Sequence, residues 1–139
     1  METKEITLVK NAIHRPEEPR HFMRIKEVKN LVTAFYKGAE IAKSSQALKL
    51  QEVGFDLYDP VYYFPNSDVR QELLIESEKT TKCPLKGEAK YFHLQLEDQL
   101  IKDVAWKYVQ PFPRSEVLKD YIAFDHRKIQ LVERINSEK

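Results

Sequence analysis

The chain has 139 residues, which is enough for one domain with a hydrophobic core of its own, and 42% of them are hydrophobic. Seven Tyr, seven Phe and one Trp exclude a disordered chain, because disordered chains contain few aromatic residues. Twenty-three basic and 22 acidic side chains give a net charge of +1, so no strong electrostatic field attracts nucleic acid or an anionic membrane. We therefore expect one globular domain that binds neither.

The first 20 residues differ from those that follow. Residues 14–20 are polar, contain two prolines and show no hydrophobic periodicity. We expect residues 1–20 to form a loosely attached arm and residues 21–139 to form the folded domain. Residues 1–10 have neither the basic start nor the apolar stretch of a signal peptide, and no run of about 18 apolar residues predicts a membrane span. The expected location is the cytoplasm.

Short strands are predicted through the first half of the domain. Apolar and charged residues alternate over 23–26, and residues 31–36 are β-branched and aromatic before a turn at 37–38. Residues 40–53 also fit one face of a helix, but the alternation of leucines with polar neighbours favours two short strand pieces. Residues 61–64 predict another strand, and the proline after them ends it because proline has no amide proton to donate.

The second half adds helical turns and a hairpin. Asn66 or Ser67 predicts the start of a short helix over 68–74, and residues 76–87 have no periodicity and predict an exposed loop. The clearest hairpin joins strands at 89–96 and 100–108. The remaining elements are a short helix at 115–119 and strands at 121–124 and 129–133. The predicted fold class is mainly β, either all-β or β-rich α+β.

The region around the only cysteine combines reactive groups. Cys83, Pro84, Lys86 and Gly87 fall within five residues. The two cations Lys82 and Lys86 flank Cys83 and favour its thiolate form. Gly87 permits a positive φ, which would turn an amide toward a ligand. Such a loop suits a nucleophile or an anion site, but Cys83 can also be a small buried hydrophobic residue beside a solvated Lys86.

Aromatic residues near this loop predict a pocket. Trp106 and Tyr108 share one face of a predicted strand, and Tyr91 and His93 share one face of its partner. Together with Tyr63 these side chains would line a concave surface for a small organic ligand. The alternative is that they pack in the core.

No known metal or cofactor motif occurs in the chain. The four histidines are scattered, and no C-x-x-C, H-x-H or H-E-x-x-H is present, so we expect neither a metal nor a cofactor. A pair of Cys83 with His93 or His21 is permitted by the sequence. No G-x-S-x-G, Walker A or G-x-G-x-x-G motif is present, and the chain has three glycines.

A set of short motifs spreads over residues 21–132: Tyr63-Phe64-Pro65, Asp68-Val69-Arg70, Cys83-Pro84-x-Lys86-Gly87-x-Ala89-x-Tyr91, Ala105-Trp106-x-Tyr108, Pro111 and Ala123-Phe124. Together they resemble the bacterial domain-of-unknown-function family four-two-seven, which some catalogues describe as nucleotidyltransferase-like. The resemblance implies a β-tent-like fold, in which two antiparallel sheets lean together and the shared residues gather in a cleft between them.

This chain departs from the family pattern at two places. Leu85 stands where many relatives have an aromatic residue, and Asp125-His126 replaces another aromatic position, so ligand preference cannot be transferred from relatives. Nucleotidyl transfer of the polymerase type needs a Gly-Ser pair and closely spaced aspartates that hold metal ions. The chain has no Gly-Ser pair. We therefore do not expect nucleotidyl transfer.

The favoured function is small-molecule binding or processing in a cleft built around residues 83–87. In a hydrolase or transferase, Cys83 would be the nucleophile, and Lys86 or the Gly87 amide would stabilise developing negative charge. Tyr91 or His93 would transfer protons. The alternative is a non-catalytic module that binds a ligand or a protein, in which the shared motif serves the fold.

Overall fold

The structure of the protein is a computed structural model, and it describes residues 10–135. These residues form eleven strands and three short 3-10 helices. The strands are β1 (Ile13–Arg15), β2 (Glu18–Glu27), β3 (Leu31–Tyr36), β4 (Ala39–Ser44), β5 (Leu48–Val53), β6 (Val61–Pro65), β7 (Leu74–Cys83), β8 (Gly87–Leu96), β9 (Gln99–Lys107), β10 (Tyr121–Phe124) and β11 (Gln130–Arg134). The helices are η1 (Asn66–Asp68), η2 (Gln71–Leu73) and η3 (Pro113–Leu118). The predicted mainly β class is confirmed.

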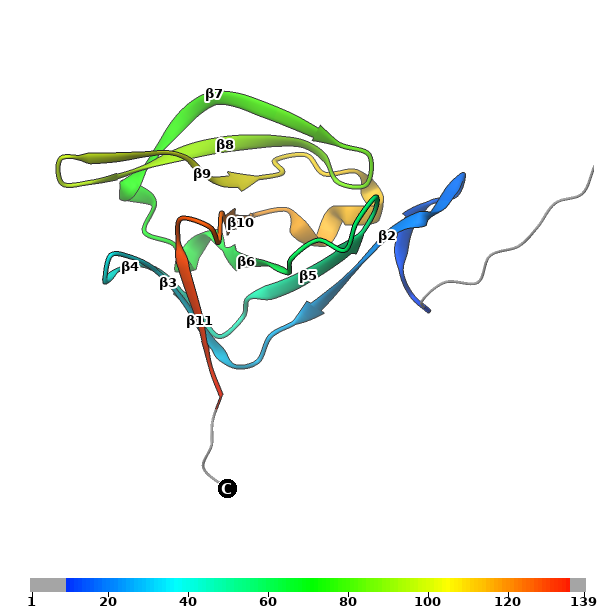
Figure 1. Cartoon of the computed structure of the whole chain (residues 1–139), viewed down its shortest axis with the longest axis horizontal. Coiled ribbons are helices and arrows are strands. Elements are labelled where there is room, and N and C mark those ends of the chain that lie inside the picture. Colours follow the sequence, from blue (N-terminus) through cyan, green and yellow to red (C-terminus); the bar gives the residue numbers. More distant parts are fainter. Residues whose placement is uncertain (1–9, 136–139) are drawn as a thin grey trace, which may run out of the picture.

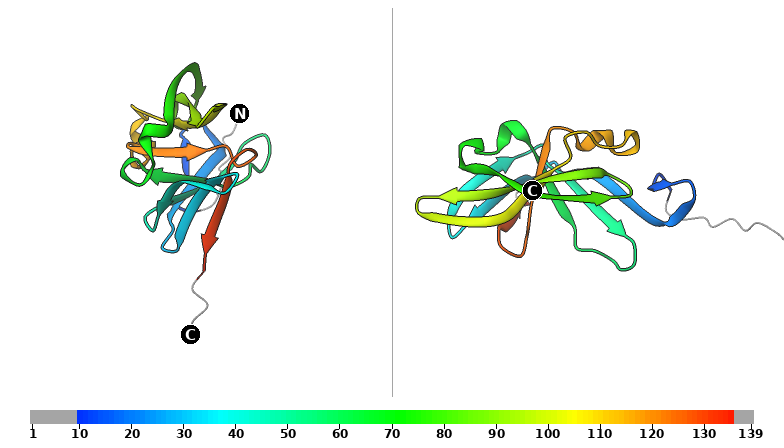
Figure 2. Two further views of the ribbon diagram at one scale, coloured as in Figure 1. Left: turned by 90° about the vertical axis from the view of Figure 1, so that its left-hand side faces the viewer. Right: turned by 90° about the horizontal axis from the view of Figure 1, so that it is seen from above.

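The strands form two antiparallel sheets, as the family resemblance implies. The large sheet has the order β1-β2-β5-β6-β10-β9-β8-β7, and the small sheet has the order β11-β3-β4. Figure 1 shows that the large sheet is strongly bent, since β7, β8 and β9 lie above β2, β5 and β6. In the left-hand view of Figure 2, β10 (orange) crosses between these two groups of strands.

The large sheet has a hydrophobic core on each face, because alternate side chains of a strand point to opposite sides. Phe64 of β6 belongs to the first core, which it shares with Val32 of the small sheet, so this core lies between the sheets. Its neighbour Tyr63 belongs to the second core, whose other members come from the large sheet, the segments next to its strands and η3. The bend of the large sheet encloses this second core.

Most of the predicted strands are confirmed. The two strand pieces expected in residues 40–53 are β4 and β5, and the predicted hairpin is β8 and β9. The turn at 37–38 joins β3 to β4, and both of its residues have a positive φ. Strands β5 and β8 were predictable because apolar and polar residues alternate along part of each of them.

The predicted helix at 68–74 and the predicted loop at 76–87 are wrong. The helix is replaced by the two single turns η1 and η2, because Val69 between them is extended (φ −113°, ψ 139°) and forms a bridge with Ala42 of β4. The loop is largely strand β7. This strand lies at the edge of the large sheet and exposes most of its residues, so no alternation of apolar residues marks it.

Two further predictions change in detail. The helix predicted at 115–119 is η3, and Ser115 lies inside it rather than at its start. Part of the predicted arm is ordered as strand, since β1 pairs with β2 and β2 already begins at Glu18. Residues 1–9 of that arm lie outside the described residues. No helix within residues 10–135 is long and apolar enough to cross a membrane.

Candidate functional site

The turn that joins β7 to β8 carries the string of residues 83–87. Cys83 ends β7 and pairs with Gly87, the first residue of β8, so the chain reverses over the three residues between them. Gly87 has a φ of +114°, which a residue with a side chain rarely adopts. The expectation of a positive φ at this glycine is confirmed. The string forms the tight end of a hairpin rather than a free loop.

The segment after β9 holds this turn from outside. Three successive carbonyl groups of the turn each accept a hydrogen bond: Pro84 from Arg114 Nη1 (3.3 Å), Leu85 from Ser115 Oγ (2.7 Å) and Lys86 from the backbone amide of Phe112 (3.0 Å). The Leu85 side chain is buried in the second core. These contacts fix the backbone of the turn and therefore the position from which the Lys86 side chain extends.

Lys86 forms a buried ion pair with Glu52 of β5. Lys86 Nζ donates a hydrogen bond to Glu52 Oε1 at 2.7 Å, and the two side chains are only 8% and 14% exposed. The other carboxylate oxygen, Oε2, lies 2.7 Å from Nε2 of His21 on β2. One carboxylate therefore joins the β7–β8 turn to two strands at the far end of the same bent sheet.

The charges of this cluster stabilise each other. Burial by itself raises the pKa of Glu52, but the Lys86 charge and the hydrogen bond with His21 lower it more, so the net shift is downward. Burial lowers the pKa of Lys86, but nearby groups that are negative when ionised, including Glu52, raise it by more. Both groups are therefore ionised at neutral pH.

Two tyrosines lie within electrostatic reach of this ion pair. Burial raises the pKa of Tyr63 to about 12, although the Lys86 charge opposes the shift. Burial also raises the pKa of Tyr108 far above its ordinary value. Both phenols are therefore protonated at neutral pH. Trp106 Nε1 donates a hydrogen bond to the Tyr63 oxygen at 3.4 Å, and its ring lies 5.8 Å from the ring of Tyr91.

A cavity of about 890 Å³ opens beside the ion pair. Its wall includes Cys83, Lys86 and Tyr108, together with Glu52 and His21. The rim is formed by the β1–β2 hairpin and by the loop that follows β5. In Figure 1 the β7–β8 turn, β2 and the β5–β6 loop come together at the right-hand end of the molecule.

The position of this cavity corrects one expectation from the resemblance. The shared residues were expected in a cleft between the two sheets, but no residue of β3, β4 or β11 lines the cavity. The cavity lies at the second core, which the large sheet makes by bending. The physical reason is the alternation on β8 and β10: the shared Ala89 and Ala123 belong to the second core, whereas Phe124 faces the small sheet.

The structure brings some of the predicted site residues together. Cys83, Lys86 and Tyr108 line the cavity, whereas Tyr63, Trp106 and Tyr91 lie in or against the second core behind it. Gly87 shapes the turn and is not part of the cavity wall. The Tyr91 hydroxyl lies 3.1 Å from Thr81 Oγ1 on the neighbouring strand.

His93 belongs to a separate polar cluster. Its Nδ1 accepts a hydrogen bond from the backbone amide of Asp103 at 3.0 Å, and Ser77 Oγ donates to Asp103 Oδ1 at 2.5 Å. The registers of both β7 and β9 shift beside this part of β8, and Asp103 has a φ of +51°. His93 lies six residues beyond Gly87 along β8, and at about 3.3 Å per residue this places it far from the group around Cys83.

Glu52 is the site residue that the sequence did not indicate, and His21 was considered only as a partner of Cys83. One signal existed: a buried lysine needs a carboxylate partner. The chain has 22 acidic residues, and no local pattern selects Glu52 among them. Among residues 10–135, no three His, Cys, Asp or Glu side chains gather in a way that could hold a metal ion.

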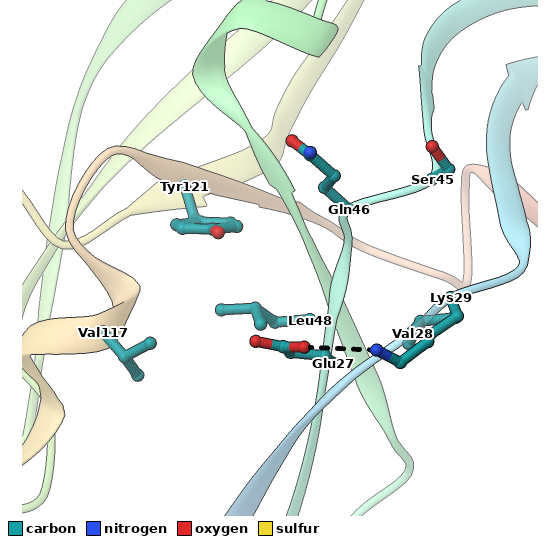
Figure 3. Close-up of a pocket in the computed structure, with 8 residues that line it drawn as sticks. All are labelled: Glu27, Val28, Lys29, Ser45, Gln46, Leu48, Val117 and Tyr121. Atoms are coloured by element: carbon teal, nitrogen blue, oxygen red, sulfur yellow. Dashed lines mark ion pairs between the residues drawn. The ribbon is translucent and has the colours of Figure 1, made fainter.

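A second cavity of about 550 Å³ lies between the β2–β3 connection, the start of β5 and η3. Figure 3 shows Glu27 and Lys29 on its wall, joined by the ion pair of 3.9 Å, with Leu48 and Tyr121 nearby. Both charged side chains are largely exposed, at 78% and 88%, so this pair adds little free energy. The candidate site is therefore the cavity beside Lys86.

The fold and this site define a small, mainly β domain with a buried ion pair at the wall of one cavity. Comparison with protein-family models matches residues 24–134 to the family described as Domain of unknown function (DUF427), whose model is named NTP_transf_9. The chain belongs to this family. The comparison with curated proteins found no match. The matched segment begins at Arg24, so the cavity residues of the β1–β2 hairpin precede it.

Proposed function

We propose that the protein binds a small organic molecule in the cavity beside Lys86, and that Cys83 Sγ is the atom that reacts with it. One observation carries the proposal: Cys83 lines a cavity of about 890 Å³ together with the ionised pair Lys86–Glu52. Cavities of about this volume are typical of small-molecule sites. A buried ion pair adds little net stability relative to apolar residues of the same shape, so ligand binding explains its presence better than folding does.

The reaction that we propose is acyl transfer to water. The thiol proton of Cys83 passes to His21, and the thiolate forms an S–C bond to the carbonyl carbon of the substrate. The electron pair of the carbonyl bond moves to its oxygen, and the Lys86 ammonium stabilises that negative charge. When the carbonyl re-forms, the bond to the leaving group breaks, and the leaving group takes the proton from His21.

The second half of the cycle restores the enzyme. Water adds to the thioester carbon and gives a proton to His21, and the S–C bond then breaks. The carboxylic acid leaves, and the thiolate takes the proton back from His21. His21 replaces Tyr91 and His93 in the proton-transfer role, because neither of those residues lines the cavity.

A second candidate function rests on a different observation. The three carbonyl hydrogen bonds from residues 112–115 and the positive φ of Gly87 give most of the shared motif a task in the fold. These contacts are sufficient to explain the shared motif if the protein is a non-catalytic binding module in which Cys83 is a structural residue.

The test uses p-nitrophenyl acetate and the full chain. We expect a burst of nitrophenolate, close to one equivalent per chain, and an acetyl adduct on Cys83 by mass spectrometry. Cys83→Ala should abolish both, and Lys86→Met should slow the burst by about tenfold or more, since one donor to the developing oxyanion is lost. Ser45→Ala, a change on the wall of the other cavity, serves as the control.

Equal nitrophenolate release by the wild type and Cys83→Ala would contradict the catalytic role of Cys83. Failure of the folded wild type to form any thiol adduct would favour the non-catalytic module.

A further inference from the structure

More cationic than anionic side chains line the cavity. Four cationic side chains and two carboxylates line it. Both carboxylates are already paired: Glu52 with Lys86, and Glu18 with Arg20, whose guanidinium donates two hydrogen bonds of 3.0 Å. Arg15 is paired with Glu17, which does not line the cavity, at 3.1 Å. Lys82 is the one lining cation with no ion-pair partner within residues 10–135.

The cavity also offers hydrogen-bond donors that no protein group accepts. Lys86 Nζ has three protons, and within residues 10–135 its one hydrogen bond goes to Glu52. Tyr108 also lines the cavity, and its hydroxyl has no hydrogen-bond partner among the same residues. Burial keeps this phenol protonated at neutral pH, so it remains a donor.

The Glu52 carboxylate at the cavity wall is not suited to bind a cation. Each oxygen of Glu52 already accepts a hydrogen bond, one from Lys86 and one from His21. A bound cation would have to displace one of these donors and would also meet the Lys86 charge. A bound anion would instead meet the free donors of Lys86 and Tyr108.

From this arrangement we propose that the ligand of the cavity is a small organic anion, whose carboxylate or phosphate contacts Lys86 and Tyr108 while an adjacent electrophilic carbon meets Cys83. This inference rests on the proposed function and names its substrate class. Cys83 directly precedes the three-residue turn, and Lys86 is its last residue; both line the cavity, so a small molecule can meet both. Lys82 lines the cavity and is exposed to solvent, so its charge attracts the anion before it binds.

Two reagents of nearly equal shape test this proposal at the only cysteine of the chain. In both, the Cys83 thiolate forms an S–C bond and iodide leaves with the electrons of the C–I bond. Iodoacetate carries the negative charge, and iodoacetamide is its neutral counterpart. We expect the ratio of the iodoacetate rate to the iodoacetamide rate to be about tenfold higher in the folded chain than in the urea-unfolded chain, and to fall with added salt.

A matched pair of lysine variants assigns the effect to the cavity. Lys82→Gln should lower the ratio by about two- to threefold, which is the effect of one unit charge several ångströms away in a water-like medium. Lys90→Gln, on the same hairpin, removes an equal charge outside the cavity wall and should leave the ratio unchanged.

The outcomes separate the inference from the proposed function. Reaction of the folded chain with both reagents at the ratio of the unfolded chain overturns the anionic class and leaves a small-molecule site standing. Reaction of Cys83 only after unfolding overturns both. An equal fall of the ratio in the two lysine variants overturns the assignment to the cavity, because the net charge of the chain would then be the cause.

Discussion

Glu52 and Glu133 are carboxylates in two regions of the molecule that each link distant segments of the chain, but with different kinds of partner. Each carboxylate accepts hydrogen bonds from two side chains far away in the sequence: Glu52 from residues 31 and 34 positions away, and Glu133 from residues 71 and 103 positions away. The pKa of each is lowered in the folded chain. The partners differ, because those of Glu52 are Lys86 and His21, and those of Glu133 are the neutral Tyr62 and Asn30.

The location differs as well. Tyr62 of β6 and Glu133 of β11 belong to different sheets, so their hydrogen bond of 3.0 Å ties the sheets together. Neutral donors are sufficient for this task. The Lys86–Glu52 pair lies within the large sheet and at a cavity, where a lysine that is 8% exposed adds little to stability. The comparison supports the proposal that the Lys86–Glu52 pair serves ligand binding, whereas the Tyr62–Glu133 hydrogen bond holds the two sheets together.

The largest effect is expected when the buried ion pair is broken on one side. Lys86→Met leaves the buried Glu52 without its cation and should lower the free energy of unfolding by about 3 kcal/mol. The double variant Lys86→Met, Glu52→Gln should recover most of this loss, because no buried charge remains. Urea unfolding of the three chains measures both values. A double variant as unstable as the single one would show that the pair itself, and not the orphaned charge, stabilises the fold.

A smaller effect is expected at the contact between the sheets. Tyr62→Phe removes one hydrogen bond to Glu133 and should lower the free energy of unfolding by about 1 kcal/mol. The same variant should leave the rate of Cys83 alkylation by iodoacetamide unchanged, since Tyr62 faces the first core and not the cavity. A changed alkylation rate would show that the two regions are coupled.

The smallest effect is expected on the free energy of unfolding at acid pH. A carboxyl group whose pKa is lowered by folding contributes stability above its ordinary pKa of 4.5, and this stability is lost as the pH falls through the lower folded-state value. The loss of unfolding free energy between about pH 5 and about pH 3 should therefore be smaller in Glu52→Gln than in the wild type. Glu133→Gln should change it less, because solvent screens that more exposed carboxylate. The reverse order would contradict the contrast between the two regions.

The sequence by itself determined the elements that have strand-like residue patterns or a local turn signal. The alternation of apolar residues predicted part of β2 and strands β5, β8 and β9. The β-branched and aromatic composition of residues 31–36 predicted β3, and Pro65 marked the end of β6. Gly87 was expected to adopt a positive φ, and it does. The short motifs also identified the family. Each of these signals is local, because strand alternation and backbone conformation are set by neighbouring residues.

Only the tertiary structure decided which of these residues share a site. The bend of the large sheet brings Glu52 and His21 to Lys86, whereas His93 lies six residues beyond Gly87 on β8 and joins a separate cluster with Asp103. The same bend of the large sheet places the cavity at the second core rather than between the sheets. Edge strand β7 escaped prediction for a related reason, since its stability comes from hydrogen bonds to β8 and not from a buried face. Pairings between distant segments leave no periodic mark in the sequence, because they depend on register and curvature that the whole sheet sets at once.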